Sequence, residues 1–361
     1  MLDTNQENHI QLESTVNRTD RLIPSLLFVT TSLLFSLLLA LPLAAIEGHY
    51  VGRDTLRIKR DRSADANDCL QGFHWKRARF PVQVSRSSDS RYRYLVSFPS
   101  PLPSGNETND LVTVEWHAVR DDDGKPVRAP AVVVVHESGS GMEVGRLFAR
   151  SMQAAGFHGF LVQLPYYGNR RGEGRPEEAE QLVRTLQQGS ADVRRARDAV
   201  AAIPAVNDKY IAVQGTSLGG FVVACSASLD NGFDDCYIML AGGQLYEMIS
   251  GGQKDTAEAR EQLAAAGYEG EKLRQLLAPV EPTRITHRLN PDTTWLYTAR
   301  QDTVVPLASA MALFESAGLQ KDHQMLIEAN HSPAILLLPR ILDHVVNRIR
   351  QQAGFPQHVA E

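Results

Sequence analysis

Three polar residues stand where their types and spacing could carry out nucleophilic catalysis. Ser217 is the centre of Gly215–Gly219, which reads GTSLG between a short apolar run and a helix-like apolar run. Glycines two positions before and after a serine permit a sharp strand-to-helix turn, which projects the hydroxyl from the sheet at a helix N-terminus. A serine hydroxyl needs a base to remove its proton, and a carboxylate usually orients that base. The stretch therefore predicts a nucleophile at Ser217.

Asp302 and His331 are the candidates for the acid and the base. Each directly follows a short run that reads as a strand, Thr294–Tyr297 before the aspartate and Gln324–Ile327 before the histidine. The alternatives are that Asp302 caps the next helix and that His331 is an ordinary surface residue. Their order along the chain, after the serine and in successive loops, favours an acid that orients a base.

The same chemistry needs N–H donors for the oxyanion that forms at the substrate carbonyl. The backbone N–H of Leu218, directly after the serine, is one candidate. The second is expected in the loop His136–Gly141, which reads HESGSG, with Ser138 or Gly139 as the donor. His136 precedes the nucleophile and lies in this loop, so it is interpreted as a residue that shapes the loop.

Strands that alternate with helices are expected to position these residues. Ala131–Val135 is an unbroken apolar run rich in valine, which is typical of a strand buried on both faces. Further runs read as strands at Tyr92–Phe98, Leu111–Val119, Phe160–Leu164, Tyr210–Val213, Cys236–Leu240, Thr294–Tyr297 and Gln324–Ile327. Helical spacing extends over Glu143–Ala155, Pro176–Ile203, Leu218–Leu229, Ala308–Ala317 and Pro333–Arg350. The alternation predicts an α/β fold, with a mostly parallel central sheet, helices on both faces, and functional residues at the carboxyl ends of the strands.

In element order and in these motifs, residues 129–350 resemble the α/β-hydrolase superfamily. The resemblance implies that the serine, the aspartate and the histidine form a catalytic triad that requires no metal and no organic cofactor. The HESGSG loop is similar to the loops of esterases and dienelactone-hydrolase-like members, with Glu137 where lipases often have glycine.

Two segments beside the expected site offer candidate substrate contacts. Pro165–Arg171 resembles a segment of other superfamily members, and in it Tyr167 or Arg170 could touch substrate or lock the loop. Residues 241–289 contain helical runs and resemble a cap over the pocket, although ordinary sheet-covering helices are the alternative. Near the start of that insertion, Tyr246 and Met248 are the candidate pocket-lining residues.

The composition is that of a soluble globular protein. The 361 residues are 43% hydrophobic and 22% charged, with a formal net charge of -5. An acidic balance argues against a nucleic-acid partner. The three cysteines, Cys69, Cys225 and Cys236, have neither the number of a disulfide scaffold nor the spacing of a metal site, and the last two are expected to be buried and inert.

One local exception to this composition lies near the N-terminus. Leu22–Ile46 is 25 residues long without a charge, whereas a bilayer span needs about 20. An uncleaved anchor and a cleaved signal peptide both fit, the second because Ala44 and Ala45 resemble a cleavage site; a buried core helix is the third interpretation. We therefore expect a membrane-anchored or exported protein. In it, residues 1–46 form the targeting segment, 47–128 a polar linker and a small β extension, and 129–361 the catalytic domain.

Three functions remain open on these grounds. The first is a serine hydrolase that cleaves carboxylic esters, of small-molecule or lipid-like type, through an acyl-enzyme. The same triad could cleave an amide or peptide bond, because fold and triad do not fix the leaving group. A catalytically silent, membrane-tethered binding protein is the alternative of a different class.

Overall fold

Ten strands form one mixed sheet in the computed structural model, which describes residues 46–172, 179–331 and 338–354. Their order across the sheet is β1-β2-β3-β4-β6-β5-β7-β8-β9-β10. The strands are β1 (Gly48–Arg53), β2 (Arg79–Arg86), β3 (Tyr94–Pro99), β4 (Leu111–His117), β5 (Ala129–Val135), β6 (His158–Val162), β7 (Val206–Thr216), β8 (Cys236–Met239), β9 (Thr294–Ala299) and β10 (Gln324–Ile327).

The sheet has an antiparallel half and a parallel half. Strands β1 to β4 pair antiparallel with one another, and β4 pairs antiparallel with β6. From β6 through β5, β7, β8 and β9 to β10, every pairing is parallel. The alternation of strand and helix in the sequence therefore predicts the parallel half correctly. The four strands before β5 belong to the same sheet, and they lengthen it at one edge.

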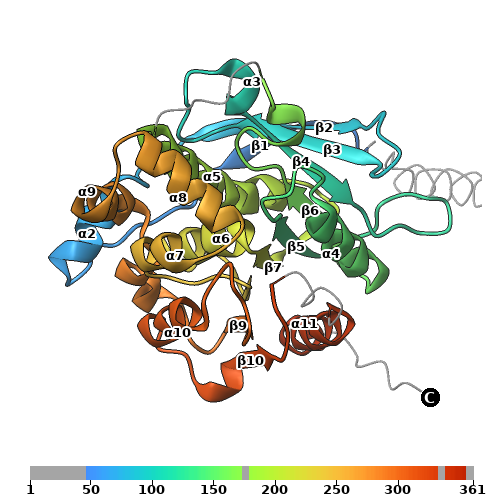
Figure 1. The fold of residues 1–361 in the computed structure, drawn as a ribbon. Coiled ribbons are helices and arrows are strands. Elements are labelled where there is room, and N and C mark those ends of the chain that lie inside the picture. The colour runs from blue at the N-terminus through green and yellow to red at the C-terminus, as the bar shows by residue number, and fades with distance from the viewer. Residues whose placement is uncertain (1–45, 173–178, 332–337, 355–361) are drawn as a thin grey trace, which may run out of the picture. The chain divides into compact units, whose positions relative to one another are not determined.

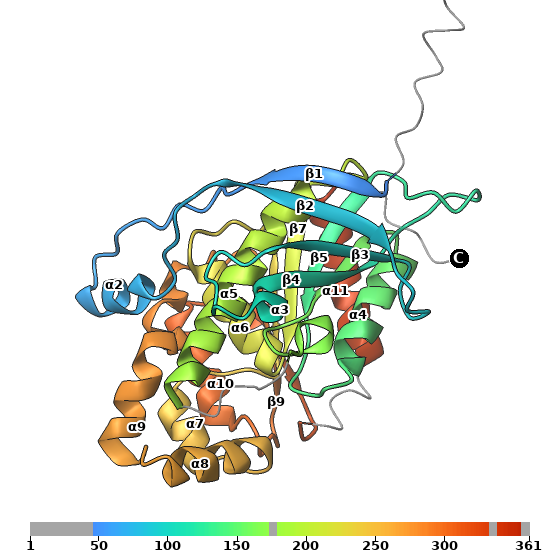
Figure 2. The same cartoon turned by 90° about the horizontal axis from the view of Figure 1, so that it is seen from above.

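Helices cover both faces of the sheet (Figure 1). Helices α4 and α11 pack on one face, while α5 and α6 pack on the other. Helices α7, α8 and α9 gather beside α10 at one end of the molecule (Figure 2). The helices are α2 (Ala64–Gln71), α3 (Glu107–Asp110), α4 (Glu143–Ala154), α5 (Ala179–Ala201), α6 (Leu218–Ser228), α7 (Leu245–Gly251), α8 (Asp255–Ala265), α9 (Gly270–Leu277), α10 (Leu307–Ser316) and α11 (Leu338–Gln352).

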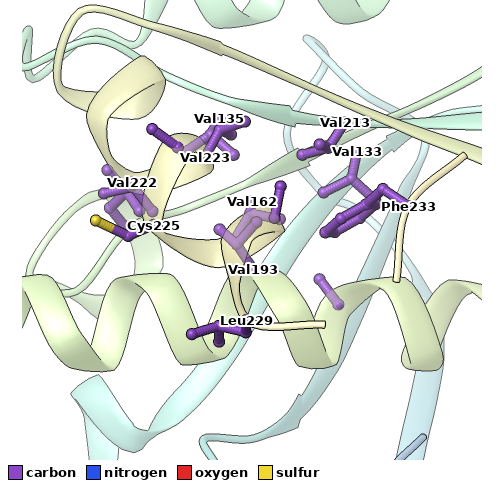
Figure 3. Packing of buried hydrophobic residues seen from close by; sticks show 14 of the residues in the cluster. Val133, Val135, Val162, Val193, Val213, Val222, Val223, Cys225, Leu229 and Phe233 are labelled. Carbon is purple, nitrogen blue, oxygen red and sulfur yellow. The ribbon is translucent and has the colours of Figure 1, made fainter. Parts of the chain in front are cut away.

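The valine run of β5 lies at the centre of the core. Because successive side chains of a strand point to opposite faces, Val133 and Val135 join the cluster under α5 and α6, whereas Val132 and Val134 join the cluster under α4 and α11. Figure 3 shows Val135 beside Val223 of α6, and Val133 beside Val213 and Phe233. Full burial of each such side chain contributes about 1.5–3 kcal/mol, so the run holds both helix layers to the sheet.

Cys225 and Cys236 are both buried and free, as expected, and Cys69 is buried as well. Burial raises the pKa of the Cys69 thiol to about 12. A thiol with that pKa stays protonated at neutral pH, and the thiolate is the reactive form. None of the three therefore has the environment of a reactive cysteine.

The polar segment 47–75 is more than the linker predicted from its composition. It contains the edge strand β1 and the helix α2, which Ser63 caps by accepting a hydrogen bond from the Ala66 N–H. Strand β2 was also missed, although Phe80, Val82 and Val84 alternate with exposed residues along it. Their alternation is the usual sign of a strand with one buried face, but charged residues and a proline interrupt the apolar pattern.

The apolar run Leu22–Ile46 lies, apart from its last residue, outside the described residues. Within the part of the chain that the structure describes, no helix has both the length and the apolar character needed to cross a bilayer.

Candidate active site

Ser217 occupies a strained turn between β7 and α6. Its φ of 54° and ψ of -117° are uncommon for a residue with a side chain. Close packing on both sides enforces the turn: a Cβ on Gly215 would lie 2.2 Å from the carbonyl oxygen of Gly219, and a Cβ on Gly219 would lie 2.2 Å from that of Val135. Only glycine fits at these two positions. The Ser217 N–H donates to the carbonyl oxygen of Met239, 2.8 Å away, which ties the turn to β8.

The structure brings Ser217, His331 and Asp302 into one hydrogen-bonded chain. The Nε2 atom of His331 lies 3.1 Å from the Ser217 Oγ, and its Nδ1 atom lies 2.6 Å from the Asp302 Oδ2. An ionised carboxylate only accepts hydrogen bonds, so Nδ1 carries the proton and Nε2 is left to accept from the serine hydroxyl. The other carboxylate oxygen accepts from the backbone N–H groups of Val304 and Val305, at 2.8 and 2.9 Å. Asp302 is 8% exposed and therefore held in place on both oxygens.

Asn330 joins the loop of the acid to the loop of the base, and sequence reasoning missed it. Its Oδ1 accepts from the backbone N–H of His331 at 2.7 Å and from that of Thr303 at 3.4 Å. The Thr303 carbonyl in turn accepts from the N–H of Gln253, at the turn between α7 and α8. The insertion thus contacts the loop that carries Asp302. An asparagine directly before the proposed base was the only signal for this role in the sequence.

The loop after β5 lies against the start of α6. The Val135 carbonyl at its beginning meets Gly219, so residues 136–141 flank the serine turn. Glu137, which replaces the glycine common in lipases, turns toward α4: its carboxylate oxygens accept from the N–H groups of Val144 and Gly145, each at 3.1 Å. The acidic side chain therefore caps a helix N-terminus, where a negative charge is stabilised.

His136 anchors this loop from inside the protein. It is fully buried, its Nδ1 lies 2.6 Å from the Glu137 carbonyl oxygen, and its Nε2 accepts from the N–H of Leu164. Burial lowers the pKa of His136 to about 4, so the ring is neutral at physiological pH. Both ring nitrogens are engaged, and this agrees with the interpretation of His136 as a residue that shapes the loop.

The predicted oxyanion donors lie in two segments, the start of α6 and the loop after β5. Leu218 is the first residue of α6, and the first N–H groups of a helix have no partner within the helix. Ser138 and Gly139 lie in the loop after β5. The Ser138 carbonyl accepts from the Tyr167 hydroxyl at 3.0 Å, and the Gly139 carbonyl accepts from the Met142 N–H.

The two candidates in Pro165–Arg171 have different surroundings. The half-buried ring of Tyr167 packs edge-on against His136 and holds the Ser138 loop through its hydroxyl. Arg170 is fully buried and pairs with Asp192 at 2.7 Å, which supports the alternative that it locks the loop. A cavity of about 340 Å³ adjoins this segment. Its lining residues are Ser138, Ser140, Tyr166, Tyr167, Arg171 and Gly172.

The structure gives the two candidates in the insertion, Tyr246 and Met248, other contacts. The Arg274 guanidinium stacks 4.0 Å above the ring of Tyr246, and the cavity that Tyr246 lines contains no residue of the triad. The Met248 side chain is partly buried against the main core. Among the described residues, no group of three or more His, Cys, Asp or Glu side chains could hold a metal ion.

Comparison with solved structures shows that the chain has the α/β-hydrolase fold. An acetyl xylan esterase from Paenibacillus sp. R4 is similar with a TM-score of 0.56 and 14% identity, over 80% of this chain and 96% of that chain. An alpha/beta hydrolase, GrgF, from Penicillium sp. sh18 is similar with a TM-score of 0.50 and 16% identity, over 72% and 99%. For a puromycin-hydrolyzing peptidase of Mycobacterium tuberculosis, the TM-score is 0.53 and the identity 14%, over 78% and 47%. Neither a family model nor a curated protein matches the sequence.

Proposed function

We propose that this protein is a serine hydrolase that cleaves carboxylic esters. The observation that carries the proposal is the hydrogen-bonded chain from the Ser217 Oγ through His331 to Asp302, at the carboxyl edge of the parallel strands. A strained serine at a helix N-terminus, a histidine in the tautomer that accepts its proton, and a buried carboxylate are the parts that acyl transfer requires.

The proposed reaction has two steps that share one base. The Ser217 Oγ attacks the ester carbonyl while His331 accepts the hydroxyl proton at Nε2. The histidine then returns this proton to the departing alcohol, which leaves an acyl-enzyme. Water attacks the acyl-enzyme with the same histidine as base, and the carboxylic acid is released. Asp302 holds the imidazole in its tautomer and stabilises the imidazolium, and it remains ionised throughout.

The oxyanion of each tetrahedral intermediate needs donors that already point at it. We assign the Leu218 N–H as one donor and an N–H of Ser138 or Gly139 as the second. Two contacts support the choice of loop: Glu137 caps α4 and Tyr167 holds the Ser138 carbonyl, so the first residues of the loop are fixed. Removal of one such donor typically lowers kcat by about 10²–10³.

The comparisons favour an ester over an amide. The similarity extends over 96% of the acetyl xylan esterase chain, but over only 47% of the puromycin-hydrolyzing peptidase chain. More than half of the peptidase chain therefore has no counterpart in this protein. The cavity beside Ser138 adjoins the proposed oxyanion loop, which makes Tyr167 and Arg171 the candidate contacts for the group next to the carbonyl.

Labelling with a fluorophosphonate probe tests the proposal. Wild-type protein should become labelled, and Ser217→Ala should not, while both unfold at similar temperatures. Labelling that survives Ser217→Ala would overturn the assignment. A folded wild-type protein that never reacts would favour the catalytically silent binding protein. A panel of p-nitrophenyl esters against aminoacyl nitroanilides then decides between ester and amide cleavage.

We also propose that the apolar run Leu22–Ile46 directs the chain to or through a membrane. Its 25 uncharged residues support the proposal. Deletion of residues 1–46 should move the protein from the membrane or exported fraction to the cytosolic fraction. An unchanged distribution after this deletion would contradict it.

A further inference from the structure

A second cavity lies at the opposite edge of the sheet from Ser217. It has a volume of about 360 Å³. The β2–β3 turn, the end of β4 and the second half of α4 surround it. His117 at the end of β4 pairs with Gly159 at the start of β6, so the cavity is near the amino ends of the parallel strands, whereas the triad is at their carboxyl ends. The lining residues are Ser87, Asp89, Ser90, Arg91, Tyr92, Arg93, Trp116, His117, Ala118, Arg120, Arg150 and Gln153.

Positive charge dominates the lining of this cavity. Of its four arginines, only Arg91 has a carboxylate partner, because Asp89 accepts from its Nε at 2.9 Å and from its Nη2 at 2.5 Å. Arg93, Arg120 and Arg150 are exposed, and none of them forms an ion pair with any residue that the structure describes. The acidic turn 121–123 does not contribute to the lining. The lining therefore has more positive than negative charge, and the Arg93 guanidinium lies beside Gly124, at the end of that acidic turn.

His117 adds a buried polar group to these charges. The residue is only 4% exposed, and its Nε2 has no hydrogen-bond partner in the described part of the chain. Burial, reinforced by Arg150 and Arg146, lowers the pKa of His117 to about 4, so the ring is neutral at physiological pH. The Nε2 atom is itself almost fully buried, so the neutral ring forms part of the wall beneath the arginines and is not a free donor to the cavity.

We propose that this cavity binds a dianionic oxyanion group, a phosphate or sulfate carried on a small molecule. Three guanidinium groups match a tetrahedral dianion, which offers enough acceptor oxygens for several arginines at once. A carboxylate has one charge and two oxygens, and it would leave most of these donors unused. The volume is at the lower end of the range for small-molecule sites, so it admits the anion together with part of the molecule that bears it.

This site lies outside the proposed catalytic site. None of its lining residues belongs to the triad or to the oxyanion loop. The anionic group therefore either belongs to a separate ligand or is a remote part of a large substrate. Charge-assisted hydrogen bonds from exposed arginines weaken in salt, so binding is measured at low ionic strength.

Isothermal titration of the full chain with inorganic phosphate, glucose 6-phosphate, acetate and glucose tests the proposal. Saturable one-site binding is expected for phosphate and for the sugar phosphate, with neither acetate nor glucose competing. Tighter binding of the sugar phosphate would show that the cavity also contacts the bearer of the anion. Arg120→Gln and Arg150→Gln should each weaken binding about tenfold or more, because each removes one charge-assisted hydrogen bond. Both residues are exposed, so the variants should fold normally.

Arg53→Gln is the matched control, because Arg53 is also exposed and also has no ion pair among the described residues, but it lies on β1 outside the cavity. It should bind phosphate like the wild type. Absence of saturable phosphate binding, or equal weakening in Arg53→Gln and Arg120→Gln, would overturn the site. Turnover of p-nitrophenyl acetate should be unchanged in Arg120→Gln, and a loss there would contradict the separation of this cavity from the triad.

Discussion

The antiparallel strands β1 to β4 and the parallel strands β5 to β10 share one sheet, but different interactions fix them in it. Strands β5, β6, β8 and β9 are buried along their whole length, as is β7 from Tyr210 onward, and apolar side chains pack on both of their faces. In β1 to β3, buried and more exposed residues alternate, so only one face of these strands is covered. The parallel half therefore has an apolar core with its polar chemistry in the loops, whereas the antiparallel half needs a further means of attachment.

Buried ion pairs add to the attachment that the shared apolar cluster and the β4–β6 pairing already provide. Asp54 pairs with Arg195 of α5 at 2.6 Å, and Glu115 of β4 pairs with Arg146 of α4 at 2.6 Å. Every side chain in these two pairs is at most 7% exposed. Each pair joins a residue from the first 117 positions to α4 or α5, helices that pack on the parallel half of the sheet. A buried pair is weak evidence of net stability, but loss of one partner leaves an uncompensated buried charge. The pairs therefore fix how the two halves fit.

The largest effect is expected from a change that affects chemistry alone. Asp302→Asn should lower kcat for a p-nitrophenyl ester by a factor on the order of 10⁴, because the amide holds the imidazole in the wrong tautomer. The amide oxygen can still accept from Val304 and Val305, so the thermal midpoint should stay close to that of the wild type. Steady-state kinetics and calorimetry on the same preparation check both statements. Near-normal turnover would mean that another acid supports His331; Glu328, which pairs with the exposed Arg300, does not face it.

Next in size is a change that affects the fold alone. Asp54→Ala removes the partner of the buried Arg195, and the free energy of unfolding should fall by about 3–5 kcal/mol. Turnover per folded molecule should remain that of the wild type. Asp208→Ala is the control, because its pair with Arg128 is 58% exposed on both sides and should contribute at most about 1 kcal/mol. Denaturant titrations of the three proteins measure this, and equal losses in the two variants would contradict a special role for buried pairs.

The same contrast explains how far the sequence predicts the structure. In the parallel half, apolar runs mark the strands, and β10 has the predicted bounds Gln324–Ile327. The chain order of Ser217, Asp302 and His331 predicts that they meet, because the ends of parallel strands lie along one edge of the sheet. In the antiparallel half, β1 and β2 have no continuous apolar run, because polar residues such as His49, Arg79 and Gln83 occupy exposed positions along them.

Side-chain burial was the part of the site that sequence could not supply. Arg170 lies in a polar loop beside the site, and only the fold shows that it turns inward to Asp192. Glu137 sits next to the expected oxyanion donors, yet it serves α4. Asn330 links two loops through one oxygen atom, a geometry that no local pattern encodes.

A smaller effect, on the pH dependence of stability, is expected from replacing Asp235. This buried aspartate directly precedes strand β8 in the parallel half of the sheet. It accepts from the hydroxyls of Tyr210 and Tyr237, its Oδ1 has no partner, and it forms no ion pair with any described residue. Burial raises the pKa of Asp235 to about 6 from its ordinary value of 3.8. The unfolded chain therefore loses this proton first, and the folded state loses stability as pH rises from about 4 through about 6.

Asp235→Asn should remove that pH dependence. Relative to the wild type, its free energy of unfolding should increase between pH 4 and pH 7 by at most about 3 kcal/mol, the equivalent of about two pKa units. Urea titrations of both proteins across this range measure the difference. A difference that is constant with pH would mean that Asp235 is ionised in the folded protein throughout.

The smallest effect is expected from replacing Asn330, which joins the loop of the acid to the loop of the base. Asn330→Ala removes the oxygen that accepts from the His331 and Thr303 N–H groups, so the base should be held less well and kcat should fall about tenfold with little change in KM. Asn330→Asp keeps an acceptor oxygen and should recover most of the rate. Its added negative charge favours the imidazolium of His331. The histidine must be neutral to act as the base, so the rise of kcat with pH should occur at higher pH than in the wild type. If Asn330→Ala lowered the thermal midpoint while turnover per folded molecule stayed that of the wild type, the asparagine would have a structural role only and would not position the base.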